Sequence, residues 1–188
     1  MEFESKRLMF REFNPEDYEA FASVFSDERV MEYAYMDRIT DTDEMLRTFN
    51  QLLENKGAAE QRGSYEFAVF LKTDGSFIGD AKIFIRYQNS MVSHGEIGYF
   101  LLPQFWGRGF ASEIAEWLAG VCFEELEMHK VVASCNVNNY QSEKIMKKIG
   151  MVKEGLLRKE RFKNGRWDDE LRYSLLAEEW ERRRKDRL

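Results

Sequence analysis

A short loop with two glycines, Pro103 to Ala111, is the part of the sequence best suited to chemistry. It stands between an apolar, strand-like run and a long helical pattern, and its glycines, Gly107 and Gly109, are one residue apart. Glycine adopts backbone conformations that other residues avoid and lets a ligand approach the main chain closely. Because unpaired N–H groups and the positive end of the dipole meet at a helix N-terminus, this loop predicts an anion site, with Arg108 as a positive charge at its rim.

Two common nucleotide-binding loops also place glycines before a helix, and the sequence departs from both. The dinucleotide-binding loop needs a third glycine, where this chain has Ser112, and a ribose-binding acid after a following strand. The Walker loop needs Gly-Lys-Ser/Thr, which the sequence lacks. On glycine spacing alone, an ordinary strand-to-helix turn remains an equal alternative to an anion site.

The wider context of the loop resembles a known signature. Gln104-x-x-Gly107-x-Gly109, with residues 96–103 (EIGYFLLP) before it and 110–113 (FASE) after it, resembles the Gln/Arg-x-x-Gly-x-Gly/Ala motif of the GCN5-related N-acetyltransferase (GNAT) superfamily. Residues 139–142 (NYQS) and 148–155 (KIGMVKEG) resemble its second motif, with Met151 where phenylalanine is usual. That exchange keeps the position apolar.

The two ends of the chain resemble one branch of the superfamily, the ribosomal-protein N-acetyltransferases (RimJ/RimL-like). The resemblance is carried by Arg7-Leu8, Arg11 and Asp17 at one end, and by Trp167-Asp168, Tyr173-Ser174-Leu175-Leu176 and Glu179-Trp180 at the other. It implies a single domain over residues 1–188 with the GNAT fold. The expected class is α/β (α+β), with a mixed, mostly antiparallel, twisted sheet of six to seven strands and helices on both faces.

The resemblance also implies the reaction and the donor. An amine attacks the thioester of acetyl-coenzyme A (acetyl-CoA) directly, and the chain shows no Cys–His or Ser–His pattern that would argue for a covalent enzyme intermediate. No metal is expected. The residues expected to bind acetyl-CoA are the main chain of Phe100, Leu101 and Leu102, the loop residues Gln104, Phe105, Trp106, Gly107, Arg108, Gly109, Phe110 and Ala111, and Asn139 with Ser142.

Two residues are expected to move protons. Glu96 is the expected general base, because it lies on the strand that leads into the loop, where a carboxylate acts directly or through a water. Ser142 is the expected donor of a proton to the leaving thiolate, the role that the resemblance implies for serine in this branch. Plainer interpretations stay open: an ion-paired strand carboxylate for Glu96, and a helix-surface hydroxyl for Ser142. Tyr140 is an alternative acid.

The acceptor is less well defined by the sequence. His94, Trp167 and Asp168 are the expected substrate-binding residues, since His94 lies near Glu96 and an acid suits a cationic substrate; a turn role for Trp167 and Asp168 stays open. We expect a primary amine, either a protein N-terminus or a small cationic amine such as a polyamine or aminoglycoside. A non-catalytic acetyl-CoA sensor is a third hypothesis.

Composition bounds the setting of this activity. The 188 residues carry a net charge of −6, although the tail from Arg182 to Leu188 holds five basic residues and one acid. The acidic remainder argues against nucleic-acid binding and suits a cationic partner. The charged N-terminal segment is unlike a signal peptide, and no apolar run approaches the roughly 18 residues of a membrane span, so we expect no membrane association and a cytoplasmic location. Homodimerisation is left open.

The expected elements place these residues on a sheet and its loops. Strands are expected over residues 7–13, 65–71, 77–86, 96–102 and 131–135, with a final hairpin of 154–162 and 167–176 that turns at Asn164-Gly165. Helices are expected after Asn14-Pro15, from about Thr42 to Lys56 with Gly57 as its end, over 109–127 and 139–149, and from Ala177. Arg158, Arg161 and Lys163 are expected to form a solvated basic face of the hairpin.

Overall fold

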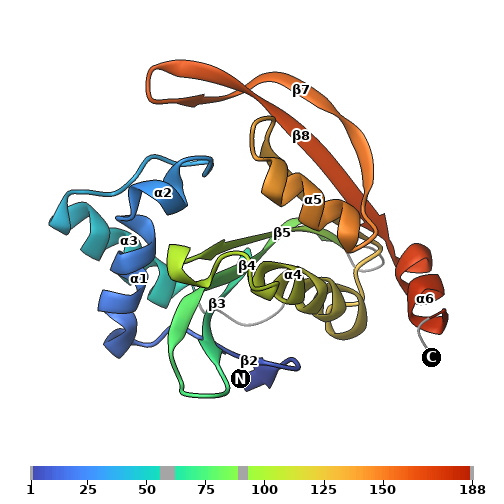
Figure 1. Ribbon diagram of the computed structural model, residues 1–188, viewed down its shortest axis with the longest axis horizontal. Helices are drawn as coiled ribbons and strands as arrows, with labels where there is room; N and C mark the ends of the chain where they lie inside the picture. The colour runs from blue at the N-terminus through green and yellow to red at the C-terminus, as the bar shows by residue number, and fades with distance from the viewer. Residues whose placement is uncertain (1, 56–61, 89–92, 187–188) are drawn as a thin grey trace.

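The computed structural model describes residues 2–55, 62–88 and 93–186. In these ranges, eight strands form one mixed sheet in the order β1-β2-β3-β4-β5-β6-β8-β7 (Figure 1). Their bounds are β1 (Glu2–Glu4), β2 (Leu8–Glu12), β3 (Ser64–Leu71), β4 (Phe77–Gln88), β5 (Ser93–Leu101), β6 (Lys130–Asn136), β7 (Val152–Lys163) and β8 (Arg166–Leu176). Every neighbouring pair is antiparallel except β5 and β6.

Helices cover both faces of the sheet, as the sequence predicted. They are α1 (Tyr18–Phe25), α2 (Glu28–Met31), α3 (Thr42–Glu54), α4 (Phe110–Gly120), α5 (Tyr140–Lys148) and α6 (Ala177–Lys185). Aspartate or asparagine side chains cap three of them: Asp27 accepts from the first turn of α2, Asp41 from that of α3 and Asn139 from that of α5. Such caps each contribute about 1 kcal/mol to helix stability.

Two hydrophobic clusters fix the helices to the sheet. On one face, α1 and α3 bury Phe21, Val24 and Phe49 against the sheet residue Ala68. On the other, α4 buries Ile114 and Leu118 with residues of β2 to β6, and Trp117 stacks on Phe10 with 3.7 Å between ring centroids. Burying one such large apolar side chain stabilises the fold by roughly 1.5–3 kcal/mol.

The sheet opens in its middle. β5 and β6 pair only where His94, Gly95 and Glu96 lie opposite Lys130, Val131 and Val132. Beyond that point β5 continues along β4 to Leu101, while β6 continues along β8 to Asn136. The main chain of β5 from Ile97 to Leu101 therefore lacks a ladder partner on its β6 side, and we call it the open edge.

The structure differs from the sequence prediction in several elements. It has eight strands instead of six to seven, because the three-residue β1, too short to show an alternating pattern, pairs with β2. The short α2 was also not predicted. The helix expected over 109–127 ends at Gly120 and continues as a π-helical turn, Val121–Glu125. The expected end of α3 at Lys56 and Gly57 lies outside the described residues.

Candidate acetyl-transfer site

The glycine loop lies directly beyond the open edge. Pro103–Phe105 form a 3₁₀ turn after β5, and Gly109 is the N-cap of α4. Gly107 and Gly109 have φ values of 73° and 78°, in the left-handed region where a Cβ is unfavourable. Gln104 and residues 106–109 are exposed, so the first N–H groups of an eleven-residue helix are accessible to an anion.

Strand alternation decides which main-chain groups of β5 face the opening. The Leu102 N–H donates to the Ile78 carbonyl at 2.9 Å, and the Phe100 carbonyl points at Gly79, so both residues present their main chain to β4. Successive residues point opposite ways, which leaves Tyr99 and Leu101 facing the opening. Of the three residues predicted to contact pantetheine, the structure thus directs only the Leu101 main chain into the opening. The indole of Trp106 donates to its carbonyl at 2.7 Å.

A charged brace holds the loop against the N-terminal segment. Glu113, in the first turn of α4, accepts from the Ser5 hydroxyl, the Arg7 N–H and the Arg7 guanidinium at 2.6–2.7 Å. The same guanidinium donates to the Arg108 carbonyl at 3.0 Å and lies 4.3 Å from the Phe110 ring centroid. Burial raises the pKa of Glu113, but the hydrogen bonds from Ser5 and Arg7, together with the charge of Arg7, hold it below its usual value. Sequence reasoning quoted Arg7 as part of a signature without seeing that it supports the loop.

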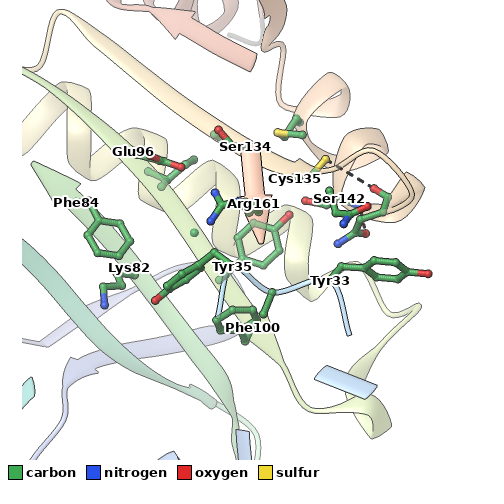
Figure 2. Close-up of a pocket in the computed structure, with 18 of the residues that line it drawn as sticks. Tyr33, Tyr35, Lys82, Phe84, Glu96, Phe100, Ser134, Cys135, Ser142 and Arg161 are labelled. Carbon is green, nitrogen blue, oxygen red and sulfur yellow. Dashed lines mark hydrogen bonds between the residues drawn. The ribbon is translucent and has the colours of Figure 1, made fainter. Parts of the chain in front are cut away.

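The N-terminus of α5 forms the wall opposite the open edge. The Asn139 side chain accepts from the Ser142 N–H at 3.1 Å and so caps α5. The Ser142 hydroxyl lies beside the phenol of Tyr99, whose pKa burial raises and Ser142 lowers. In Figure 2, Glu96 and Ser142 lie on opposite sides of the pocket, with Tyr35 and Arg161 between them.

One pocket of about 120 Å³ joins the two faces of the sheet through the opening. Tyr99, Cys135, Asn139, Ser142 and Met146 line its α5 side. The opposite side is lined by the segment before α3 and by strand residues, and its polar and aromatic members are Tyr33, Tyr35, Asp80, Lys82, Phe84, Glu96, Phe100 and Arg161. A thioester lying in the opening would therefore meet α5 on one side and an amine on the other.

The two carboxylates of the pocket are in different states. The Glu96 side chain is 12% exposed, and both of its contacts with Arg86, at 2.5 and 2.8 Å, are charge-assisted hydrogen bonds. Asp80 is 2% exposed, and its Oδ1 has no hydrogen-bond partner among the described residues. Burial, reinforced by Glu66, raises the pKa of Asp80 to about 7.

Cys135 lies in the pocket but is not a nucleophile. Burial raises the pKa of its thiol to about 11, and the Sγ is oriented toward the Asn139 carbonyl at 3.9 Å. A thiol with such a pKa is protonated at neutral pH, and the thiolate is the reactive form. Cys122 is buried away from the pocket, and burial raises its pKa as well. This chemistry favours direct transfer.

The residues expected to bind the acceptor lie around the pocket, not in its lining. His94 pairs with Tyr87 and Lys130 at the end of β5 far from the loop. Asp168 accepts from the Asn136 side chain at 3.0 Å and so touches a lining residue. Trp167 is 57% exposed on the hairpin and packs against Phe162 at 5.3 Å between ring centroids.

The basic face expected on the hairpin is not solvated throughout, which corrects the sequence interpretation. Lys163 is 7% exposed, and its ammonium donates to the carbonyls of Met31, Glu32 and Ala34 at the end of α2. Burial lowers its pKa. Arg161 pairs with the buried Glu170 and lines the pocket. The twelve-residue strand β7 arches over the rest of the molecule in Figure 1. Because of this arch, Arg161 and Lys163 contact other parts of the chain instead of solvent.

Comparison with known proteins identifies the family. The profile of the acetyltransferase (GNAT) domain matches residues 7–152. The N-acetyltransferase YnaD of Bacillus subtilis is 34% identical over 96% of this chain and 99% of its own. The chain belongs to the GNAT acetyltransferases. Acyltransferases of this family use acetyl-CoA, which agrees with an anion-binding loop beside an open strand edge.

Two solved structures share the fold of this GNAT protein at low identity. One is spermidine N-acetyltransferase of Vibrio cholerae with CoA and spermine, with a TM-score of 0.80 and 22% identity over 94% of this chain and 99% of its own. The other is ribosomal-protein-S5-alanine acetyltransferase of Vibrio fischeri, with a TM-score of 0.79 and 22% identity over 96% and 98%. Their acceptors differ, so the shared fold does not select between a polyamine and a protein.

The described residues contain no group of three or more His, Cys, Asp or Glu side chains placed to hold a metal ion. None of the described helices has the length and apolar character required to cross a membrane.

Proposed function

We propose that the protein transfers the acetyl group of acetyl-CoA to the α-amine of a protein or peptide N-terminus. The observation that carries this proposal is the order of three features along β5 and the segment after it: the pocket beside residues 96–100, the open edge up to Leu101, and then the glycine loop. The N–H groups before α4 suit a diphosphate. The open edge offers Tyr99 and Leu101 main-chain groups to an amide-containing arm.

The chemistry of the site is mainly positioning. Holding an amine and a thioester in attack geometry supplies roughly 7–11 kcal/mol of the barrier reduction. Main-chain N–H groups of the open edge stabilise negative charge on the thioester oxygen. We expect Ser142, which lines the α5 side of the pocket with Tyr99, to return a proton to the sulfur. The carboxylate of Glu96, the base predicted from sequence, pairs with Arg86.

The charge of the pocket supports a monocationic acceptor. The lining holds two acids, Asp80 and Glu96, and two cations, Lys82 and Arg161, and its aromatic residues are Tyr33, Tyr35, Phe84, Tyr99 and Phe100. A polyamine carries several cations and needs a surplus of carboxylates. A peptide N-terminus carries one amine next to apolar atoms, and its pKa of about 8 leaves more of it neutral at pH 7 than a lysine.

The donor is tested by thermal unfolding with acetyl-CoA. A ligand at 100 times its dissociation constant stabilises the native state by about 2.7 kcal/mol, so the melting temperature rises. Gly109→Val is expected to lose this shift, because it places a β-branched residue at a φ of 78° in the loop. Gly75→Val is the matched control at a φ of 71° in the β3–β4 turn, and it keeps the shift. A wild-type protein that does not respond to acetyl-CoA contradicts the proposal.

The acceptor is tested by release of free thiol with three substrates. A peptide starting with alanine is expected to react. The same peptide acetylated at its N-terminus and carrying one lysine should not, and spermidine should react at least tenfold more slowly than the first peptide. A preference for spermidine would replace the proposed acceptor with a polyamine. A thermal shift without any turnover would indicate a non-catalytic acetyl-CoA sensor.

A further inference from the structure

A β-bulge directs Asp80 into the pocket. Val69 pairs with Gly79 and Phe70 with Phe77, so Ile78 is an extra residue in β4 at this point. An ideal Cβ on Gly79 would lie 2.0 Å from the Phe100 carbonyl oxygen, and its φ of 155° also favours glycine. Bulges bend a strand and re-aim the side chains that follow. Asp80 is the first residue after the bulge and shares a face of β4 with Lys82 and Phe84, which also line the pocket.

The environment of Asp80 is unusual for a carboxylate at neutral pH. Its Oδ1 is without a partner in the described part of the chain. Lys82, the cation whose charge lowers the pKa of Asp80, already pairs with Glu66. A buried carboxylate without its own counter-ion favours the protonated form, and burial raises the pKa of Asp80 to about 7.

Charged and titratable groups face Asp80 from each element packed around it. They are Glu66 on β3, Lys82 on β4, Glu96 on β5, Tyr35 in the segment after α2 and Arg161 on β7. Burial, then the charge of Asp80, raises the pKa of Tyr35, which keeps that phenol neutral. Of these acids, Glu66 pairs with Lys82 and Glu96 pairs with Arg86 through its Oε2, whereas Asp80 forms no ion pair in the described part of the chain and its Oδ1 accepts no hydrogen bond there.

We propose that Asp80, and not Glu96, accepts the proton that the acceptor ammonium must lose before it attacks acetyl-CoA. This rests on acetyl transfer to an amine and is independent of which amine is acetylated. The ammonium gives one proton to Asp80 Oδ1, which leaves a neutral amine and a carboxylic acid. The amine forms the C–N bond, the C–S bond breaks, and the second amine proton goes to the sulfur. Asp80 then releases its proton to water.

The pH dependence of kcat/KM distinguishes Asp80 from Glu96. In the wild-type protein kcat/KM for the alanine-initiated peptide, or for spermidine if that is the amine turned over, falls as the pH drops below about 7. Asp80→Asn is expected to lower kcat at pH 7 by about 100-fold or more, the usual contribution of a general base, and to abolish the limb with a midpoint near 7. The remaining rate should fall only with the pKa of the acceptor amine, which is about 8 for an α-amine. A limb with its midpoint near 7 in Asp80→Asn, or the loss of that limb in Glu96→Gln, overturns the proposal.

Two controls separate chemistry from folding. Asp80→Asn should keep the thermal shift with acetyl-CoA, and Asp74→Asn in the exposed β3–β4 turn should keep the wild-type rate and pH profile. The deficit of Asp80→Asn should shrink to under tenfold at pH 9.5, where the α-amine, with a pKa of about 8, is already neutral. A deficit that stays constant with pH indicates a structural role and contradicts proton transfer.

The pKa of Asp80 can be measured without any acceptor, so the role of Asp80 is tested separately from the choice of acceptor. Protein labelled with ¹³C at aspartate carboxyl carbons is titrated by NMR, and the Asp80 signal is assigned by its absence in Asp80→Asn. A midpoint near 7 supports the proposal even if no peptide in the panel is acetylated. A midpoint below 5 overturns it even if the peptides react.

Discussion

The donor side and the acceptor side of the pocket are built on opposite principles. On the donor side, the glycine loop and α4 are held by Glu113, whose carboxylate oxygens accept three hydrogen bonds from Ser5 and Arg7. On the acceptor side, Asp80 has an oxygen without a partner, and Lys163 is buried against carbonyls. The first arrangement stabilises the native state, whereas burial of Asp80 opposes it. Binding a constant donor requires rigidity, and deprotonating an amine requires a group held away from its preferred state.

The largest expected effect comes from removing the charge of Asp80. Its pKa is raised from 3.8 to about 7, so the native state binds the proton more tightly than the unfolded state, and stability falls as the pH rises from about 4 to 7. This corresponds to up to about 4 kcal/mol. Asp80→Asn should therefore be more stable than wild type at pH 8, with the gain vanishing toward pH 4, as measured by urea unfolding.

Asp74→Asn, in the turn between β3 and β4, is expected to change stability with the opposite sign to Asp80→Asn. Hydrogen bonds from Ser76 lower the pKa of Asp74, so its contribution is present above pH 4 and is lost as the pH falls through its folded pKa. The variant should be slightly less stable than wild type at pH 8. If Asp80→Asn behaves the same way, the contrast between the two sides of the pocket fails.

The second largest effect is expected on the donor side. Arg7→Ala leaves the Glu113 carboxylate, 15% exposed, without its guanidinium, and hydrogen bonds to charged groups contribute about 1.5–3 kcal/mol. We expect the free energy of unfolding, measured with urea, to fall by about 2 kcal/mol. We also expect the affinity for CoA, measured by calorimetry, to be roughly tenfold weaker, which corresponds to about 1.4 kcal/mol of binding free energy. Lys6→Ala, an exposed neighbour, should change neither. Unchanged CoA affinity in Arg7→Ala would show that the loop does not need its brace.

Lys163→Met tests whether the hairpin positions the acceptor side alone. The variant keeps the aliphatic length but leaves the carbonyls of α2 and Ala34 unpaired, at a cost of about 1–3 kcal/mol. Because Tyr33 and Tyr35 follow α2 into the pocket, KM for the peptide should rise several-fold while CoA affinity is unchanged. Lys153→Met, exposed on the same strand, is the control. A parallel loss of CoA affinity would mean that the two sides are coupled.

The smallest effect is expected from one neutral hydrogen bond. Trp106→Phe keeps most of the ring and removes the donor to the Leu101 carbonyl, a contact of about 0.5–1.5 kcal/mol. CoA should bind two- to tenfold more weakly, with peptide KM unchanged at saturating acetyl-CoA. An effect larger than that of Arg7→Ala would show that the open edge, not the charged brace, dominates donor binding.

The sequence predicted the donor side because its signals are local. Gly107, Gly109 and the Asn139 cap lie within short segments whose types report their backbone conformation. The acceptor side is assembled from four separate segments, namely the one after α2, β4, β5 and β7, and no spacing of residues in the sequence indicates that they meet. From sequence, Asp80 is predicted to be an ordinary polar residue of an alternating strand, because a β-bulge has no clear sequence pattern. Lys163 is predicted to be solvated, because only the arch of β7 brings its side chain to the end of α2.

The short parallel ladder has a consequence for how this chain tolerates changes in length. Pairing of β5 with β6 stops at Glu96, and β5 ends at Leu101, so the open edge measures about 17 Å at the usual rise of a strand. One inserted or deleted residue there would shift the thioester by about 3.3 Å relative to the loop, whereas attack geometry tolerates about 1 Å. Insertions at the Gly75 turn meet no such limit. We expect active length variants of this chain to have no insertion or deletion within residues 97–101, because their number sets the distance between the diphosphate and the sulfur of acetyl-CoA.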